Sequence, residues 1–99
     1  MIRRVPFDPE ATEEFFEAMR WYESARPGLG WEFLGEVHRA VTLIEKHPDI
    51  GSPVRGSIRR VLLRRFPYWL YYRVEGDVLR VLACYGARRD QSDLDTRIH

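Results

Sequence analysis

The sequence predicts an α+β domain in which a helical hairpin packs on one face of a small, mainly antiparallel sheet. Apolar residues recur at helical spacing across residues 8–47, and strand-like alternation fills residues 58–85. The loop between the two expected helices is so short that they must run antiparallel. Their apolar stripe and the apolar face of the sheet then bury each other. Ninety-nine residues form one domain, 1–99.

The first helix is predicted from its end signals. A short strand is expected before it at about 2–7, where Val5 and Phe7 alternate with polar residues. Asp8-Pro9-Glu10 then indicates a helix start, because the Asp8 side chain can accept from free backbone N–H groups and proline suits the first position. Arg26-Pro27-Gly28 ends this helix at about residue 25.

The second helix is expected at about 29–47. His47-Pro48 ends it, because proline disfavours helical backbone at the residue before it. Trp21 and Trp31 lie off the main apolar stripes of the two helices, so we expect partial exposure of one or both. The stripe of the second helix consists of Leu34, Val37, Val41 and Ile44.

The rest of the chain is predicted to be a loop followed by three strands. Residues 51–57 have the composition of a loop, and the tail from about residue 90 is polar and expected to be flexible. Pro67 is expected to bend the chain, and Gly76-Asp77 to form a hairpin turn. The expected strands are Ile58–Phe66, Tyr68–Glu75 and Val78–Tyr85, which gives the order β-α-α-β-β-β.

Alternation along the middle strand places its side chains on two opposite faces of the sheet. Leu70, Tyr72 and Val74 are expected in the core under the helices. Trp69, Tyr71 and Arg73 fall on the opposite face, which we expect to be open to solvent. Cys84, within an apolar strand, is expected to be a buried structural thiol.

Composition excludes several classes of protein. An apolar fraction of 44% indicates a folded chain, not a disordered one. No apolar run approaches the ~20 residues of a membrane span, and the N-terminus lacks a signal-peptide pattern, so a cytoplasmic protein is expected. His38, His47 and His99 have no metal-ligand spacing with carboxylates or Cys84, so we expect no metal and no other cofactor.

The net charge of +1 hides an asymmetry. Residues 1–50 carry six basic and ten acidic side chains, a balance of −4, and residues 51–99 carry ten basic and five acidic ones, a balance of +5. All basic residues except Lys46 are arginines. Because arginine presents a flat fork of donors suited to phosphate and carboxylate, its clustering in the second half indicates an anionic partner.

With these residues in view, nearly the whole chain, about 5–90, resembles the RelE/ParE toxin superfamily. Each matching stretch is weak alone, and their order and spacing carry the resemblance. In the first half these are Ala18-Met19-Arg20-Trp21-Tyr22, Arg26-Pro27-Gly28-Leu29-Gly30, Phe33-Leu34, Val37, and His47-Pro48 with Gly51. In the second half they are Ile58-Arg59-Arg60-Val61, Arg65-Phe66-Pro67-Tyr68, Tyr72-Arg73-Val74 and Gly86-Ala87-Arg88-Arg89-Asp90.

The resemblance implies the toxin of a type II toxin–antitoxin system, with a cognate antitoxin as partner. It also implies a role in plasmid stabilisation, contact with operator DNA only through the antitoxin, and the possibility of a higher assembly with it. RelE-like members cut ribosome-bound mRNA, whereas ParE-like members poison DNA gyrase without catalysing a reaction. An inactive family member kept only as an antitoxin partner is a third possibility.

The residues at the RelE catalytic positions favour the ParE-like alternative. Arg60, Arg64 and Arg88 match basic positions, but Trp69 replaces the arginine expected after the bend. The C-terminal tyrosine position falls near Leu94, which can carry no proton. If the chain is a nuclease, the catalytic candidates are Arg60, Arg64, Tyr85 and Arg88.

Two surfaces are therefore expected. Tyr85 could donate a proton beside the arginines, but a ring buried at the end of a strand is the interpretation we favour. Trp69 and Tyr71 could stack nucleic-acid bases, but the interpretation we favour is that they anchor an apolar antitoxin helix. The expected target- or phosphate-binding residues are Arg55, Arg59, Arg60, Arg64, Arg65, Arg88 and Arg89. The expected antitoxin-binding residues are Trp69, Tyr71 and Arg73.

Overall fold

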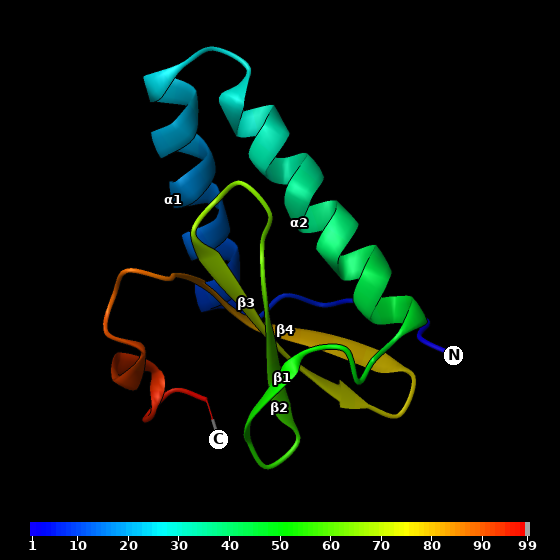
Figure 1. Ribbon diagram of the computed structural model, residues 1–99. Coiled ribbons are helices and arrows are strands. Elements are labelled where there is room, and N and C mark those ends of the chain that lie inside the picture. The colour runs from blue at the N-terminus through cyan, green and yellow to red at the C-terminus, as the bar shows by residue number, and fades with distance from the viewer. Residues whose placement is uncertain (99) are drawn as a thin grey trace.

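A computed structural model describes residues 1–98 and shows two helices on one face of a four-stranded antiparallel sheet (Figure 1). The strands lie in the order β1-β2-β3-β4, each paired with its neighbour in sequence. The expected α+β architecture and the number of four strands are confirmed, but the order differs, because the strand expected before the helices is not formed and an unpredicted edge strand follows them. The helices are α1 (Pro9–Ala25) and α2 (Leu29–Lys46), and the strands are β1 (Ser52–Arg55), β2 (Ile58–Leu62), β3 (Tyr68–Glu75) and β4 (Val78–Gly86).

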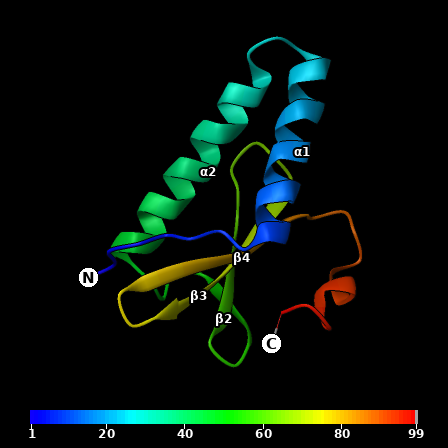
Figure 2. The same cartoon turned by 180° about the vertical axis from the view of Figure 1, so that it is seen from behind.

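The predicted first strand is a shorter pairing in the structure. The N-terminal segment runs parallel to β4 and forms isolated bridges from Arg4 to Val78 and from Phe7 to Val81 (Figure 2). The chain leaves β4 after one further backbone bond, from the Asp8 N–H to the Val81 carbonyl at 2.9 Å. The prediction that the Asp8 side chain caps the first helix is wrong. Its carboxylate accepts a hydrogen bond from Arg80 at 3.2 Å and none from a helical N–H group.

The Glu23 carboxylate and a close contact between α1 and α2 at Gly30 hold the helical hairpin together. The two Glu23 oxygens accept from the N–H groups of Gly28 and Gly30 at 2.9 and 3.0 Å. Gly28 has φ +91, which favours glycine. A Cβ added at Gly30 would lie 2.9 Å from the Met19 carbonyl oxygen, so only glycine lets α1 and α2 approach so closely.

The expected loop at 51–57 contains the edge strand β1 and its turn. β1 pairs Ser52 with Arg60 and Pro53 with Arg59, and every residue in it is exposed. An exposed edge strand lacks the apolar alternation that predicts strands, and proline is tolerated there because one edge N–H would be unpaired anyway. The next strand ends at Leu62, earlier than predicted, because Arg65 adopts φ +68 and turns the chain before Pro67.

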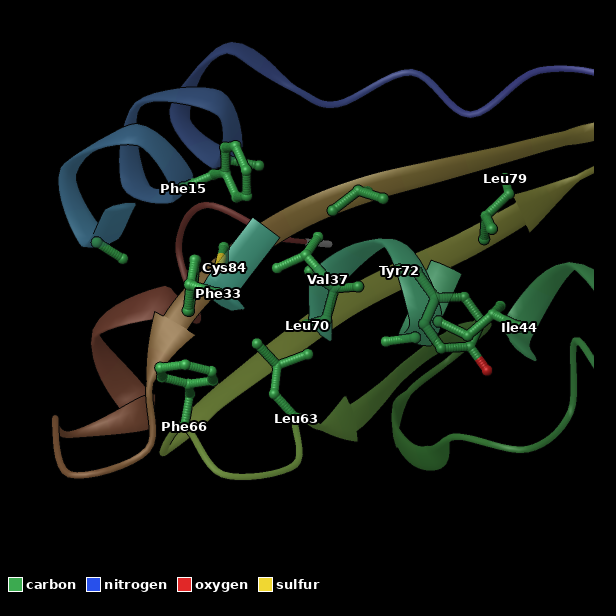
Figure 3. Packing of buried hydrophobic residues seen from close by; sticks show 14 residues of the cluster. Phe15, Phe33, Val37, Ile44, Leu63, Phe66, Leu70, Tyr72, Leu79 and Cys84 are labelled. Carbon is green, nitrogen blue, oxygen red and sulfur yellow. The ribbon is translucent and has the colours of Figure 1, made fainter. Parts of the chain in front are cut away.

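The main core lies between the helices and the sheet (Figure 3). Phe33 and Phe66 meet edge to face with ring centroids 5.3 Å apart, and Tyr22 packs on Phe66 at 4.8 Å. Leu70 and Tyr72 are buried in this core as expected, with Val74 packed against it. Cys84 is also buried there, as predicted, and burial raises the pKa of its thiol to about 12.

The opposite face of the sheet is covered, contrary to the expected open face. A 3₁₀ turn, η1 (Gln91–Leu94), and the residues after it pack across β3 and β4, so the tail from about residue 90 is held against the sheet instead of extending from it. Leu94 and Ile98 are only 2% and 5% exposed. They form a second apolar cluster with Ile58, Tyr71, Leu82, Ala83 and Tyr85.

Side chains from distant parts of the sequence hold this tail. Arg97 donates two hydrogen bonds to Glu14 of α1, at 2.7 and 3.0 Å, and one to the Leu82 carbonyl at 2.9 Å. Glu14 also accepts from the Cys84 N–H at 3.0 Å. The pair therefore caps the part of the β4 edge that the N-terminal segment leaves unpaired, which protects that edge from pairing with another chain.

Candidate functional site

The seven arginines predicted to bind an anion do not form one patch, because three of them are used within the fold. Arg55 donates to the carbonyls of Asp95 and Ile98 in the tail. Arg59 donates to the carbonyls of Asp49 and Gly51, at 3.1 and 2.8 Å, on the helix side of the sheet. Arg65 pairs with Glu32 of α2.

The other four, with one arginine that the sequence did not single out, gather at one end of the molecule. We call this set, Arg20, Arg60, Arg64, Arg88 and Arg89, the basic end. None of the five forms an ion pair within residues 1–98. Their positive charges are therefore not neutralised by a carboxylate in this part of the chain.

Contacts across the sheet connect two of these arginines. The guanidinium carbon of Arg60 lies 3.8 Å from the centroid of the Trp69 ring, and Arg60 also donates to the Tyr71 hydroxyl at 3.1 Å. Trp69 is the cross-strand partner of Tyr85, and Arg89 lies over the Tyr85 ring at 4.0 Å. Arginine and aromatic side chains therefore alternate along a row from β2 to the loop after β4.

The loops that carry the remaining arginines are joined by a backbone bond. The Ala87 N–H donates to the Pro67 carbonyl at 2.7 Å, which places the loop holding Arg64 beside the loop holding Arg88. The tail fixes the second loop, because Gln91 donates to the carbonyls of Gly86 and Arg89 at 2.9 and 2.7 Å. After β4 the chain passes beside α1 (Figures 1 and 2), and Arg20 of α1 lines one cavity together with Arg89 of this loop.

A cavity of about 500 Å³ separates α1 from this loop. Arg20 and Trp21 line it from α1, and Tyr68 and Arg89 from the sheet side. Trp21 is 67% exposed, which agrees with the expectation that an off-stripe tryptophan would be exposed; Trp31, at 69%, lines no part of this cavity. Sequence reasoning missed Arg20 and Trp21 because it sought the site on the sheet alone.

Two carboxylates also line the cavity. Arg97 neutralises Glu14 through its two hydrogen bonds. Glu17 is exposed and has no hydrogen-bond or ion-pair partner within residues 1–98, so it is an unpaired negative charge that lines the cavity. Burial raises the pKa of Tyr68, the phenol of this cavity, above its ordinary value.

The predicted proton carriers are poorly placed for catalysis. Tyr85 is 3% exposed, as favoured, although its ring lies under the tail and not under the helices. Leu94, at the position of the C-terminal tyrosine, is buried. His38 is exposed on α2 and lines a separate apolar groove, and His47 follows the C-terminus of that helix. His99 lies outside the described residues.

The predicted antitoxin-binding residues have different environments. Trp69 is half-buried beside Arg60, and Arg73 pairs with Glu75 at 2.9 Å. Tyr71 is only 2% exposed and donates to Gln91 at 2.6 Å, so the tail covers it. The expectation of Tyr71 on an open surface is therefore wrong, whereas the antitoxin-binding role of these residues stays a prediction.

Within residues 1–98, no three histidine, cysteine or acidic side chains come close enough together to hold a metal ion. Neither described helix has the length and apolar character needed to cross a membrane.

Solved structures of two kinds of toxin share this fold. A chain of the chromosomal ParDE toxin–antitoxin system from P. aeruginosa aligns with a TM-score of 0.75 at 15% identity, over 89% of this chain and 98% of that one. The isolated E. coli RelE toxin aligns with a TM-score of 0.64 at 21% identity, over 93% and 92%. A RelE mutant in complex with an antitoxin RelBc peptide aligns at 0.66 and 18% identity, over 97% and 93%.

Comparison of the sequence with family models assigns the chain more specifically than these shared folds do. No curated protein sequence matches significantly. A family model does match, over residues 5–91, and describes the ParE toxin of the type II toxin–antitoxin system parDE. This range includes both helices, all four strands and the five arginines of the basic end. The chain therefore belongs to the ParE toxin family of type II toxin–antitoxin systems.

Proposed function

We propose that this toxin arrests growth by binding DNA gyrase through the basic end, without catalysing a reaction, and that a cognate antitoxin neutralises it. The supporting observation is a surface rich in unpaired arginines and poor in proton carriers. Cleavage of an RNA backbone needs one group to activate the 2′-hydroxyl and another to protonate the leaving oxygen. Arginine does neither, because it stays protonated.

The other ionisable groups at the basic end do not complete such a pair. Tyr85 is buried beneath Arg89, and the raised pKa of Tyr68 makes its phenol a weaker acid and leaves still less of it deprotonated to act as a base at neutral pH. Glu17 is the one unpaired carboxylate at the cavity. A single carboxylate can serve as base or acid in one step, but not as both. Binding is the activity that these groups support.

The proposed function implies a cellular location and a set of antitoxin contacts. A gyrase poison works in the cytoplasm and reaches operator DNA only through its antitoxin, with which it can form a higher assembly. Trp69 and its neighbours Tyr71 and Arg73 are the proposed antitoxin contacts. Because the tail covers Tyr71, an antitoxin segment would contact Trp69 first.

The test is a paired assay on the purified toxin. It should inhibit supercoiling and promote gyrase-linked DNA breaks, while ribosome-bound mRNA stays intact. Arg88→Ala should weaken the gyrase effect, whereas Arg39→Ala, which removes a cation paired with Glu36 on α2, should leave it unchanged. Codon-phased mRNA cuts without any effect on gyrase would overturn the proposal. Tyr85→Phe should then slow cleavage about 10²-fold if Tyr85 is the acid or base.

Expression in a bacterium provides the cellular counterpart. The chain alone should arrest growth, and co-expression of the cognate antitoxin should restore it. Normal growth at confirmed soluble expression of the unmutated chain would indicate an inactive family member.

A further inference from the structure

We propose that the basic end binds a single strand of DNA, with one base stacked on Trp21 in the cavity between α1 and the loop after β4. The inference rests on the proposed function, because gyrase would supply the strand. It adds a DNA contact to an activity that could otherwise depend on protein surfaces alone.

The cavity offers the two elements of a single-strand site. The Trp21 indole is 67% exposed and makes no ring contact with any of residues 1–98. Arg20 and Arg89 line the same cavity and have no carboxylate partner in that part of the chain. Proteins that bind single strands combine a basic groove with aromatic side chains on which bases stack.

The remaining arginines extend the path of positive charge in two directions. Arg88 and Arg64 lie on the joined loops beside the cavity, and Arg60 follows across the sheet after Trp69 and Tyr85. A partner that contacts several separated cations needs a repeated negative charge. A nucleic-acid strand supplies one phosphate every few ångströms along its backbone.

Trp69 is a poorer platform for a base than Trp21. The Arg60 guanidinium already covers its ring at 3.8 Å, and Trp69 is half-buried. Its role in this site is to orient Arg60. Trp21 has a free ring surface, and removing its side chain should not disturb the core.

Substitution of Glu17 tests whether the cavity binds a phosphate or has only a structural role. Its unpaired carboxylate lines the cavity and repels any phosphate placed on Arg20 or Arg89. Across about 8 Å of water this repulsion corresponds to roughly a twofold change in affinity. Glu17→Gln should therefore strengthen strand binding, a gain that loss of a structural contact would not give.

The experiment measures the binding of a labelled single-stranded oligodeoxynucleotide to the full-length toxin, without gyrase, over a series of salt concentrations. Trp21→Ala should weaken binding about tenfold or more, whereas Trp31→Ala, which removes an equally exposed tryptophan on α2, should not. Arg20→Ala and Arg89→Ala should each reduce the slope of log affinity against log salt by about 0.7. Arg39→Ala, which removes a paired arginine, should leave the slope unchanged.

Each outcome decides for or against the site. A selective loss with Trp21→Ala, smaller salt slopes and a gain with Glu17→Gln support it. Absence of binding at low salt, or equal effects of Trp21→Ala and Trp31→Ala, overturns it. Preference for a polyglutamate peptide over the oligonucleotide also overturns it and assigns the surface to an acidic protein segment. Gyrase inhibition that fails while Trp21-dependent DNA binding persists contradicts the proposed function alone.

Discussion

Replacing Leu94 with alanine should destabilise the whole domain, although the residue lies in the C-terminal tail. Leu94 is 2% exposed and packs in the second apolar cluster with Tyr71, Leu82 and Tyr85. Truncating a buried leucine to alanine costs about 2–5 kcal/mol, through lost burial and the cavity left behind. The tail can partly relax, so we expect about 2–3 kcal/mol. For a domain of this size that lowers Tm by about 8–24 °C.

The assay is thermal unfolding followed by circular dichroism, with urea unfolding as a second measure of the free energy. Asp93→Ala is the matched control, because Asp93 is exposed in the same 3₁₀ turn and surface substitutions usually change stability by less than about 0.5 kcal/mol. A Leu94→Ala variant that unfolds at the same temperature as Asp93→Ala would show that the tail contributes nothing to stability. The sheet would then be equally stable without the packing of the tail on its face.

Four further changes test three other parts of the structure. Gly51→Ala should destabilise the fold by about 1–3 kcal/mol in urea unfolding, because a Cβ there would lie 2.7 Å from the Tyr72 hydroxyl. Tyr72→Phe should cost a similar amount, about 1–3 kcal/mol, because that hydroxyl accepts from the Gly51 N–H at 3.0 Å and donates to the Pro48 carbonyl at 2.6 Å. Equal stability of either variant and wild type would contradict the packing. Burial raises the Cys84 pKa from 9.0 to about 12, so the neutral thiol stabilises the fold fully below pH 9 and this contribution is lost as pH rises toward 12. Cys84→Ala should therefore lose less stability than wild type across that window, and parallel pH curves would refute this. Trp69→Ala should weaken antitoxin binding by about 2 kcal/mol or more in calorimetry, and unchanged affinity would remove Trp69 from the interface.

The helices and the hairpin turn of the sheet could be predicted because their signals are local. Pro9, Arg26-Pro27-Gly28 and His47-Pro48 stand within a residue or two of the observed helix ends. Gly76 has φ +62 in the predicted turn between β3 and β4. Each signal acts through the backbone of its own segment, so no knowledge of the rest of the chain is needed.

The tail could not be predicted, because its contacts join residues far apart in sequence. Residues 90–98 contain only two large apolar side chains, too few to show a period. Their partners lie on the sheet, and Arg97 reaches Glu14, 83 positions away. Asp90 does give a local signal, since its side chain accepts from the Ser92 N–H at 3.0 Å, as aspartate does at turns. That signal predicts a turn but not where the turn docks.

The role of the candidate site stays a prediction, but the structure shows which of its arginines are available. Four of the arginines that the charge asymmetry drew attention to, Arg60, Arg64, Arg88 and Arg89, form no ion pair within residues 1–98. Strand alternation could not show that Arg55 and Arg59 donate to backbone carbonyls, because those carbonyls belong to other segments. Arg20 was missed because α1 contributes to the site only once the loop after β4 is placed beside it.

The opposite charges of the two halves also follow from the fold, because α1 and α2 pack on the sheet. Within residues 1–98, four ion pairs cross between the halves, and three of them join an arginine of the second half to a carboxylate of the first: Arg65 with Glu32, Arg80 with Asp8, and Arg97 with Glu14. The more exposed pairs, Arg65–Glu32 and Arg80–Asp8, contribute only about 0–1 kcal/mol each, whereas the Arg97–Glu14 pair is partly buried.

Pairing between the halves does not account for the basic end. Its five arginines have no carboxylate partner within residues 1–98, although the first half carries the acidic excess. Placing unpaired cations near one another is unfavourable through mutual repulsion. Contacts with Trp69, Tyr71 and Tyr85 hold Arg60 and Arg89, but they give no reason for gathering all five cations. The polyanionic partner that we propose would remove their mutual repulsion when it binds.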